Sequence, residues 1–525
     1  MADYHLQASR YTDFEKPGER FLYRAFEILP GFLSWTVLVL AVFLSYFKPF
    51  WVAVFIIIFA IFWFLRSIYF SVHLRIGYRF MRKNEKINWV EKLNSLSPSQ
   101  YSLNKITKKI KLSNWQEIYH LVLIPSYKEP IKILRNTLDS IKKNDYPQDK
   151  IIVVLGLEER AGDPARQIAK ILEKEFKNSF FKFLITFHPK DIPGEIAGKS
   201  SNEAWGTQIA KKQVIDRLKI PYENIILTSL DADTVVYPKY FSCLTYYYLT
   251  AENPVRSSFQ PIPLYINNIW EASPIARVFA FSSTFWHTLN QERPEKLITF
   301  SSHSMSFKAL VDIGFKQTNV VSEDSRVFWQ CLLKFDGDYQ VVPIHYPVSM
   351  DANTLPSFWK TLANTYKQKR RWAYGAENIP YFLFGFLKNK KIPFSRKFFL
   401  SFEVIEGQLT WATAPILIYV LGWLPILVGK GEFGQMLISY NLPVMLSRVL
   451  TAAMIGLIGS AYLSLLLLPP KPPQYGKSKI FIFFLQWFIV PLTMIFFSAL
   501  PALDAQTRLM LAKYMGFWPT PKFRK

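Results

Sequence analysis

The sequence predicts an α/β domain with a mostly parallel sheet, inserted between membrane-spanning helices at both ends of the chain. Long apolar runs without charged residues near both ends predict the membrane helices. Segments with strand-like and helix-like patterns alternate between residues 119 and 230, which is typical of an α/β domain. Polar side chains follow three of the predicted strands, and such positions place a binding site at one edge of the sheet.

Five apolar runs predict the membrane helices, because a helix needs roughly 20 such residues to cross a bilayer core. Two runs come first, at 31–47 and 50–65, and three come late, at 407–429, 449–470 and 480–503. The first run is not a signal peptide, since another run follows at once without a small-residue cleavage site. We therefore expect two membrane helices, a long polar domain, and about three, possibly four, further membrane helices.

The net charge of +24 is distributed in a way that points to a membrane. Strong positive charge also occurs in proteins that bind nucleic acid. Here, however, ten Lys and Arg against three acids lie in 71–120, directly after the second apolar run, and another basic cluster lies in 388–397. Positive residues beside membrane helices mark the cytoplasmic side. The sequence therefore predicts a multi-pass protein of the cell membrane with a cytoplasmic polar domain, in contact with membrane lipids and not with nucleic acid.

The polar domain shows strands and helices in regular alternation. Apolar runs predict four strands, and segments with apolar residues at helical spacing predict the helices between them. In chain order these are strand 119–127, helix 132–143, strand 151–157, helix 163–176, strand 181–187, helix 199–212 and strand 224–230. Ligands of such sheets bind at the carboxyl ends of the strands. The polar residues at those ends are Ser126 and Glu129, then Glu158 and Glu159, then Asp231 and Asp233.

Asp231 and Asp233 stand one residue apart directly after a buried strand. Acids at such a place commonly close a strand or cap a helix. Two carboxylates on a tight turn also suit a divalent cation such as Mg²⁺ or Mn²⁺, and the oxygens of a diphosphate would complete its shell. For the pair taken alone, both interpretations stay open.

Two further motifs have a structural and a functional interpretation. Glu323 and Asp324 begin an apolar helical segment, where acids favour the helix dipole but can also serve as catalytic groups. Gln368, Arg371 and Trp372 precede an aromatic stretch, where Arg and Trp can anchor a helix at the membrane surface.

In order and spacing, these motifs resemble those of the membrane-embedded family-2 glycosyltransferases, which include cellulose, chitin and hyaluronan synthases. The resemblance is carried by IPSYKEP (124–130), AGKSSNEAW (197–205), SLDADT (229–234), SED (322–324), QKRRW (368–372) and FWPTPK (517–522). The chain looks like a divergent cellulose synthase-like branch. Glu158 and Glu159 replace the aspartate pair usual in the family, and Pro519 replaces a valine.

The resemblance implies a GT-A domain, the fold of nucleotide-diphospho-sugar transferases, and a role for each motif. Asp324 is the expected catalytic base, Asp231 and Asp233 hold the metal ion, and Glu323 and Trp372 contact the acceptor. The residues expected to bind the donor, a UDP- or GDP-sugar, are Ser126, Glu129, Glu158, Glu159, Lys199, Asn202, Asp231, Gln368 and Arg371. The expected reaction is inverting sugar transfer to a growing glycan. The alternatives are transfer of one sugar to a lipid carrier and a nucleotide-gated transporter.

These inferences divide the chain into five parts. They are an N-terminal region with two transmembrane helices (1–70), a cytoplasmic GT-A domain (71–375), an amphipathic interfacial segment (376–400), C-terminal transmembrane helices (401–503) and a basic tail (504–525). The tail resembles a gating loop of the family and is therefore expected on the cytoplasmic side. Five crossings from a cytoplasmic N-terminus would put it outside, so either a sixth crossing lies in 398–448 or one run is re-entrant.

Overall fold

Four parallel strands form the first half of the central sheet in the computed structural model, which describes residues 7–106, 111–429, 431–476 and 478–523. The strands are β1 (Tyr119–Pro125), β2 (Ile151–Glu158), β3 (Lys182–His188) and β4 (Ile225–Ser229), in the order β3-β2-β1-β4. The helices between them are α5 (Ile131–Lys142), α6 (Asp163–Phe176) and α7 (Lys199–Ala210). Each predicted element of this half is confirmed, with boundaries that differ by at most two residues.

The second half of the sheet adds antiparallel pairs to the parallel ones, so the sheet as a whole is mixed. It adds β7 (Ser304–Ser306), β6 (Ser257–Leu264), β8 (Gln340–Ser349) and β5 (Val235–Val236) in that order after β4. β7 pairs antiparallel with both β4 and β6, and β5 pairs antiparallel with β8. Only the β6–β8 pair is parallel here. β5 and β7 have two and three residues, which is too short for a periodic pattern in the sequence.

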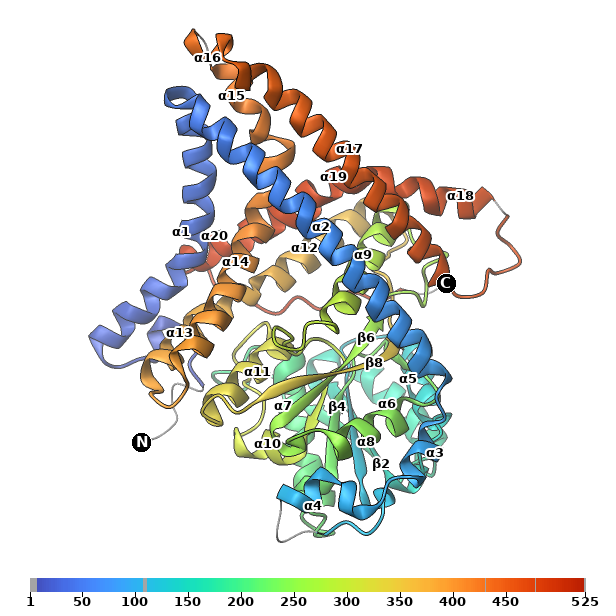
Figure 1. Cartoon of the computed structure of the whole chain (residues 1–525). Coiled ribbons are helices and arrows are strands. Elements are labelled where there is room, and N and C mark those ends of the chain that lie inside the picture. Colours follow the sequence, from blue (N-terminus) through green and yellow to red (C-terminus); the bar gives the residue numbers. More distant parts are fainter. Residues whose placement is uncertain (1–6, 107–110, 430, 477, 524–525) are drawn as a thin grey trace.

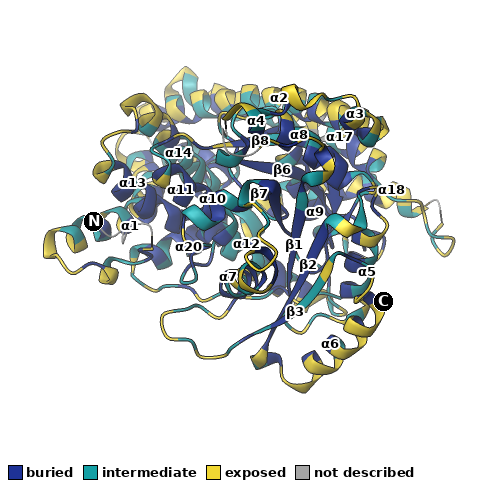
Figure 2. Ribbon diagram, turned by 90° about the horizontal axis from the view of Figure 1, so that it is seen from below, coloured by how far each residue is buried: buried dark blue, intermediate teal, exposed yellow. Residues whose placement is uncertain are grey.

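Helices cover the sheet and connect it to the rest of the chain. They are α8 (Tyr240–Thr250), α9 (Pro274–Asn290), α10 (Phe307–Asp312), α11 (Glu323–Lys334), α12 (Phe358–Ala373) and α13 (Asn378–Lys388). Figure 2 shows β1 and β2 as buried, whereas the outer face of α6 is exposed. Strands that are buried on both faces have continuous apolar sequences, and this is why these strands could be predicted from the sequence.

The long apolar helices lie together at one end of the domain (Figure 1). Within the described residues, four helices are long and apolar enough to cross a membrane, or five if one bent pair counts as a span. The four are α1 (Pro17–Phe47), α2 (Pro49–Lys86), α17 (Leu437–Leu466) and the segment Ser478–Met510. The bent pair joins Phe394–Tyr419 to Leu421–Val428 at an angle of 47°. These lengths and compositions support a multi-pass membrane protein.

The segment Ser478–Met510 has both of its ends on the side of the domain. Before it, the Trp270 indole Nε1 donates to the carbonyl oxygen of Pro469 at 3.2 Å. After it, the tail reaches back so that Lys522 Nζ donates to Asp233 Oδ2 at 2.7 Å. In Figure 1 the segment runs from α18 (Ser478–Leu485), beside α17, to α20 (Leu500–Met510), beside α1. Residues that flank this segment on both sides therefore contact the domain.

The first half of 376–400, predicted to lie at the membrane interface, forms part of the protein core instead. Most of α13 is buried inside the protein, where the Phe382 ring stacks on Trp329 with centroids 4.3 Å apart. Its aromatic residues complete the core around α11 instead of lying on a membrane surface. At the start of α14 (Phe394–Tyr419), by contrast, Phe394 and Phe398 are 80% and 62% exposed.

Candidate active site

The loop after β1 is organised around Glu129. Its carboxylate accepts hydrogen bonds from the Ser126 hydroxyl at 2.8 Å and from the Tyr127 backbone N–H. The Ser126 N–H donates to the Gly156 carbonyl of β2 at 2.8 Å, which ties the loop to the neighbouring strand. Burial raises the pKa of Glu129 to about 7, although these hydrogen bonds favour its ionised form. Ser126 and Glu129 therefore form one wall at the carboxyl edge of the sheet.

Glu158 at the end of β2 and Asn202 on α7 lie at this edge of the sheet, and Glu159 follows Glu158 directly. The buried Glu158 carboxylate forms an ion pair with Arg160, whose guanidinium lies 4.0 Å from the centre of the Tyr127 ring. Glu159 is exposed. Asn202 Nδ2 donates to the Gly156 carbonyl at 2.8 Å, and its buried Oδ1 has no hydrogen-bond partner among the described residues.

Lys199 joins the two acidic motifs of the sequence. It is the first residue of α7, and its ammonium lies 2.7 Å from Asp231 Oδ1, just after β4. The same ammonium donates to Asp324 Oδ1 and Oδ2 at 3.0 and 2.9 Å, at the start of α11. Glu323 Oε1 lies 3.6 Å away. The structure thus brings the SLDADT and SED motifs within reach of one cation.

Burial and electrostatic interactions within this cluster determine which of its carboxylates are ionised. Burial alone would raise the pKa of Asp231 and Asp324, but the nearby positive charges together outweigh it: Lys199 and Lys522 at Asp231, and Lys199 and Lys316 at Asp324. Both pKa values therefore lie below their ordinary range. Burial and the charge of Asp324 raise the pKa of Glu323 to about 8. These shifts favour the ionised form of Asp324 and the protonated form of Glu323 at neutral pH.

Several residues that support this cluster were missed by the sequence reasoning. Glu377 holds the SED loop, since its Oε1 accepts from the Val321 and Ser322 N–H groups at 2.9 and 2.7 Å. Lys316 Nζ donates to Glu203 Oε2 at 2.6 Å and lies 3.9 Å from Asp324 Oδ1. These contacts join segments far apart in the chain, so spacing alone carried no signal for them.

The C-terminal tail lies across the site. Lys522 Nζ donates to Asp233 Oδ2 at 2.7 Å, and the same oxygen accepts from the Asp351 N–H at 2.9 Å. Phe517 packs on Gly198, where any Cβ would approach the Phe517 Cβ to 2.7 Å. The guanidinium of Arg371 lies 4.7 Å from the centre of the Phe517 ring. The last tail residues, 524–525, lie outside the described residues, as do residues 107–110 of the domain.

The predicted metal site has the donor atoms that a divalent cation prefers, but too few of them. Among the described residues, no group of three or more His, Cys, Asp or Glu is arranged to hold a metal ion. Asp231 and Asp233 do hold cationic groups, since each receives a lysine ammonium at 2.7 Å. A Mg²⁺ or Mn²⁺ ion fits these hard oxygens only if further oxygens, such as those of a diphosphate, complete its shell.

The residues of the QKRRW motif contact different parts of the site. Gln368 Oε1 accepts from Asn353 Nδ2 at 3.1 Å. The Trp372 ring lies against Tyr265, with centroids 6.2 Å apart, and the Tyr265 phenol in turn feels the charges of Asp231 and Asp324. Tyr265, which lies in the segment between β6 and α9, is a residue that the sequence reasoning missed.

Lys369, also in this motif, is buried beside Trp372, and no acidic side chain among the described residues forms an ion pair with it. Its ammonium donates to Ser283 Oγ at 3.0 Å and lies 4.2 Å from the centre of the Trp372 ring. Burial lowers the pKa of Lys369 to about 7. The motif therefore places a weakly basic amine, an indole and a guanidinium on one helix beside the acidic cluster.

The protonation of Glu323 leads to a pH-dependent prediction for Glu323→Gln. Its folded pKa is raised, so its contribution to stability is present below the unfolded pKa and is lost as pH rises through about 8. Glutamine mimics the protonated side chain at every pH. The melting temperature of the variant, relative to wild type, should therefore rise by about 2 °C or more between about pH 5 and pH 9. A difference in melting temperature that is constant over this range would show that Glu323 is ionised in the fold.

Comparisons with known proteins agree with this architecture. Residues 226–500, more than half of the chain, match the family model "Glycosyl transferase family group 2". No curated protein sequence matches the chain. A solved mannosyltransferase from Pyrobaculum calidifontis, in complex with GDP-Man and Mn2+, is similar at 14% identity and a TM-score of 0.39, covering 77% of this chain and 99% of its own.

A second similar structure is S. aureus TarS 1-349 in complex with UDP-GlcNAc, at 12% identity and a TM-score of 0.35, covering 66% of this chain and 92% of its own. At such low identity and TM-score, neither likeness bears on the substrate of this chain. The family match, which runs from β4 through the SED and QKRRW motifs, is the decisive one. The chain belongs to the glycosyl transferase family group 2, with a mixed GT-A-like sheet flanked by long apolar helices.

Proposed function

We propose that the protein transfers a sugar, with inversion, from a UDP- or GDP-sugar to a hydroxyl of a growing glycan at the cytoplasmic face of the membrane. The observation that carries this proposal is the position of Lys199 between Asp231 and Asp324, at 2.7 and 2.9 Å. A sugar-transfer site needs a group that binds the leaving diphosphate beside a group that takes a proton from the acceptor. Lys199 joins residues suited to these two tasks.

The donor would lie at the carboxyl edge of β1, β2 and β4. The buried Asn202 Oδ1, without a partner among the described residues, is a free acceptor for an N–H or O–H of the nucleoside. Ser126, Glu129 and Glu158 line the same edge. Gln368 on α12 accepts from Asn353, which stands two residues after Asp351, whose N–H donates to Asp233. Lys199 and Arg371 supply positive charge for the diphosphate. When bound by Asp231, Asp233 and the diphosphate, Mg²⁺ or Mn²⁺ supplies Lewis-acid neutralisation of the leaving group.

Asp324 would act as the general base. In the reaction, the acceptor oxygen bonds to the anomeric carbon, the bond from that carbon to the diphosphate breaks, and Asp324 takes the hydroxyl proton. Asp324 is 19% exposed, whereas Glu323 is 3% exposed and its raised pKa favours the protonated form. The contact with Lys199 makes Asp324 a weak base, so we expect the ammonium to shift toward the diphosphate when the donor binds. That shift raises the basicity of Asp324 only in the donor complex.

The acceptor would approach from the side of α12. Trp372 and Tyr265 offer ring faces for a sugar, and the protonated Glu323 can donate a hydrogen bond to it. The tail would have to withdraw first, because Lys522 lies on Asp233 in the structure. A lipid-linked acceptor would use the same chemistry, since only the group attached to the sugar differs.

The proposed function is tested by incubating the purified protein with radiolabelled UDP- and GDP-sugars, with and without Mg²⁺ or Mn²⁺. We expect transfer from one nucleotide class, dependent on the metal ion. Product size then separates a growing polymer from a single sugar on a lipid carrier. Hydrolysis or transport of the nucleotide without any glycoside product would contradict the proposal.

We further expect Asp231→Asn and Asp233→Asn to weaken metal-dependent binding of the donor at least tenfold, which is about 1.4 kcal/mol. Each change replaces one of the two carboxylates that would bind the metal ion by a neutral amide. Calorimetry with a nucleoside diphosphate, with and without Mg²⁺ or Mn²⁺, measures the effect. Asp216→Asn on the surface of the domain is the matched control. Unchanged metal-dependent affinity in both site variants would make the motif a structural turn.

A further inference from the structure

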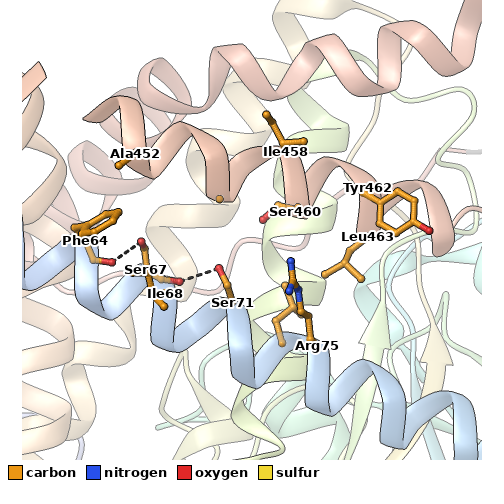
Figure 3. Close-up of a pocket in the computed structure, with 13 residues that line it drawn as sticks. Phe64, Ser67, Ile68, Ser71, Arg75, Ala452, Ile458, Ser460, Tyr462 and Leu463 are labelled. Carbon is orange, nitrogen blue, oxygen red and sulfur yellow. Dashed lines mark hydrogen bonds between the residues drawn. The ribbon is translucent and has the colours of Figure 1, made fainter. Parts of the chain in front are cut away.

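A groove of about 640 Å³ opens between two long apolar helices, away from the candidate active site. One wall is formed by α2 from Phe64 to Arg75, and the other by α17 from Ala452 to Leu463 (Figure 3). Farther from the domain the same two helices are in direct contact, where Ala60 packs in one cluster with Leu446. The groove therefore occupies the half of the helix pair that lies toward the domain.

The sequence explains why the helices leave space here. α17 presents small residues, including Ala452, Gly456 and Gly459, and a Cβ at Gly456 would meet no atom within 4 Å. On α2, Ser67 Oγ donates to the Phe64 carbonyl at 2.7 Å and Ser71 Oγ donates to the Ser67 carbonyl at 2.8 Å (Figure 3). Because both serine hydroxyls donate to backbone carbonyls of their own helix, this wall of the groove can accommodate an apolar ligand.

Arg75 closes the groove at its domain end with a positive charge. One guanidinium nitrogen lies 3.6 Å from where a Cβ of Gly459 would stand, so the side chain lies against α17 (Figure 3). Among the described residues, Arg75 has no ion pair and no hydrogen bond through its guanidinium. A cation at the edge of an apolar groove attracts an anionic group at the level of the lipid headgroups.

The length of the groove matches one leaflet of a bilayer. Arg75 lies eleven positions after Phe64 on α2, which corresponds to a helical rise of about 16 Å. Half of a hydrocarbon core of roughly 30 Å is about 15 Å. An acyl chain that starts at Arg75 would therefore extend along the whole groove and end near the middle of the membrane.

We infer that this groove binds one anionic phospholipid of the leaflet beside the catalytic domain, with its phosphate on Arg75 and an acyl chain between α2 and α17. A bilayer phospholipid is favoured over a lipid-linked acceptor, because none of the lining residues belongs to the candidate active site. The lipid would stabilise the position of α2, whose Gly77 packs on the backbone of Thr288 in α9. The inference does not depend on which sugar the protein transfers.

The test uses native mass spectrometry of the full-length protein in detergent, titrated with phosphatidylglycerol or phosphatidylcholine of equal chain length. Wild type should bind phosphatidylglycerol at least tenfold more tightly. Arg75→Gln should lose this preference and keep its binding of phosphatidylcholine. Gly456→Leu, which fills the open part of the groove, should lose binding of both lipids.

Arg79→Gln is the matched control, because Arg79 is exposed one turn later on α2 and does not line the groove. Phosphatidylglycerol should raise the melting temperature of wild type and of this control, but not that of Arg75→Gln; the same melts show that each variant is folded. An unchanged preference in Arg75→Gln, or an equal loss in Arg79→Gln, overturns the inference. Displacement of phosphatidylglycerol by polyprenyl phosphate at lower concentration also overturns it, in favour of a lipid-linked acceptor.

Discussion

Replacing Asp324 by asparagine is expected to lower the rate of sugar transfer by about 10²–10⁴-fold, the usual contribution of a general base. The side chain keeps its size, but it can no longer take the proton of the acceptor hydroxyl. Donor binding should remain, since Lys199 keeps Asp231 as a partner at 2.7 Å. Initial rates with saturating donor, together with calorimetry of nucleoside diphosphate binding, measure the two effects separately.

The neighbouring Glu323→Gln is a matched control for this prediction. It makes the same chemical change one residue earlier, at a side chain that is already protonated at neutral pH. Its transfer rate at about pH 7 should therefore stay within a few-fold of wild type. If Glu323→Gln is inactive and Asp324→Asn is active, the two roles are reversed. If both variants turn over normally, the base lies elsewhere.

Lys199→Met is expected to have the largest effect on stability. The change leaves the largely buried Asp231 and Asp324 side chains without the cation that they share. Removing one partner of a buried ion pair typically costs about 3–5 kcal/mol. Thermal unfolding in detergent should show the loss at neutral pH, and donor binding should fall with it. By contrast, Lys211→Met removes a surface pair with Asp216 and should cost about 1 kcal/mol or less.

A double variant keeps the Lys199 prediction decisive even if Lys199→Met folds poorly. Adding Asp324→Asn removes one of the uncompensated charges, so Lys199→Met with Asp324→Asn should be more stable than Lys199→Met alone. This non-additivity is the signature of two residues in direct contact. Additive effects would mean that the 2.9 Å contact between Lys199 and Asp324 contributes nothing to the fold.

The candidate site could be located from the sequence, but its arrangement could not. Asp231 and Asp233 after an apolar strand, and Glu323 and Asp324 at a helix start, are local patterns, and the structure places both pairs where those patterns predict. Of Glu158 and Glu159, both expected at the donor, Glu158 is buried and Glu159 is exposed. Neither residue spacing nor composition shows which of two adjacent acids faces a cleft, because the side-chain direction depends on packing around the loop.

What the sequence by itself determined is the set of local elements: the strands β1 to β4, the helices between them and the long apolar helices. Each depends on residues close together in the chain, since periodicity and apolar length are local properties. Only the tertiary structure decided that Lys199 joins Asp231 to Asp324, that Lys522 reaches Asp233, and that Ser478–Met510 returns to the domain's side. These features depend on contacts between residues far apart in sequence, whose free energies come from burial and charge pairing in the folded chain.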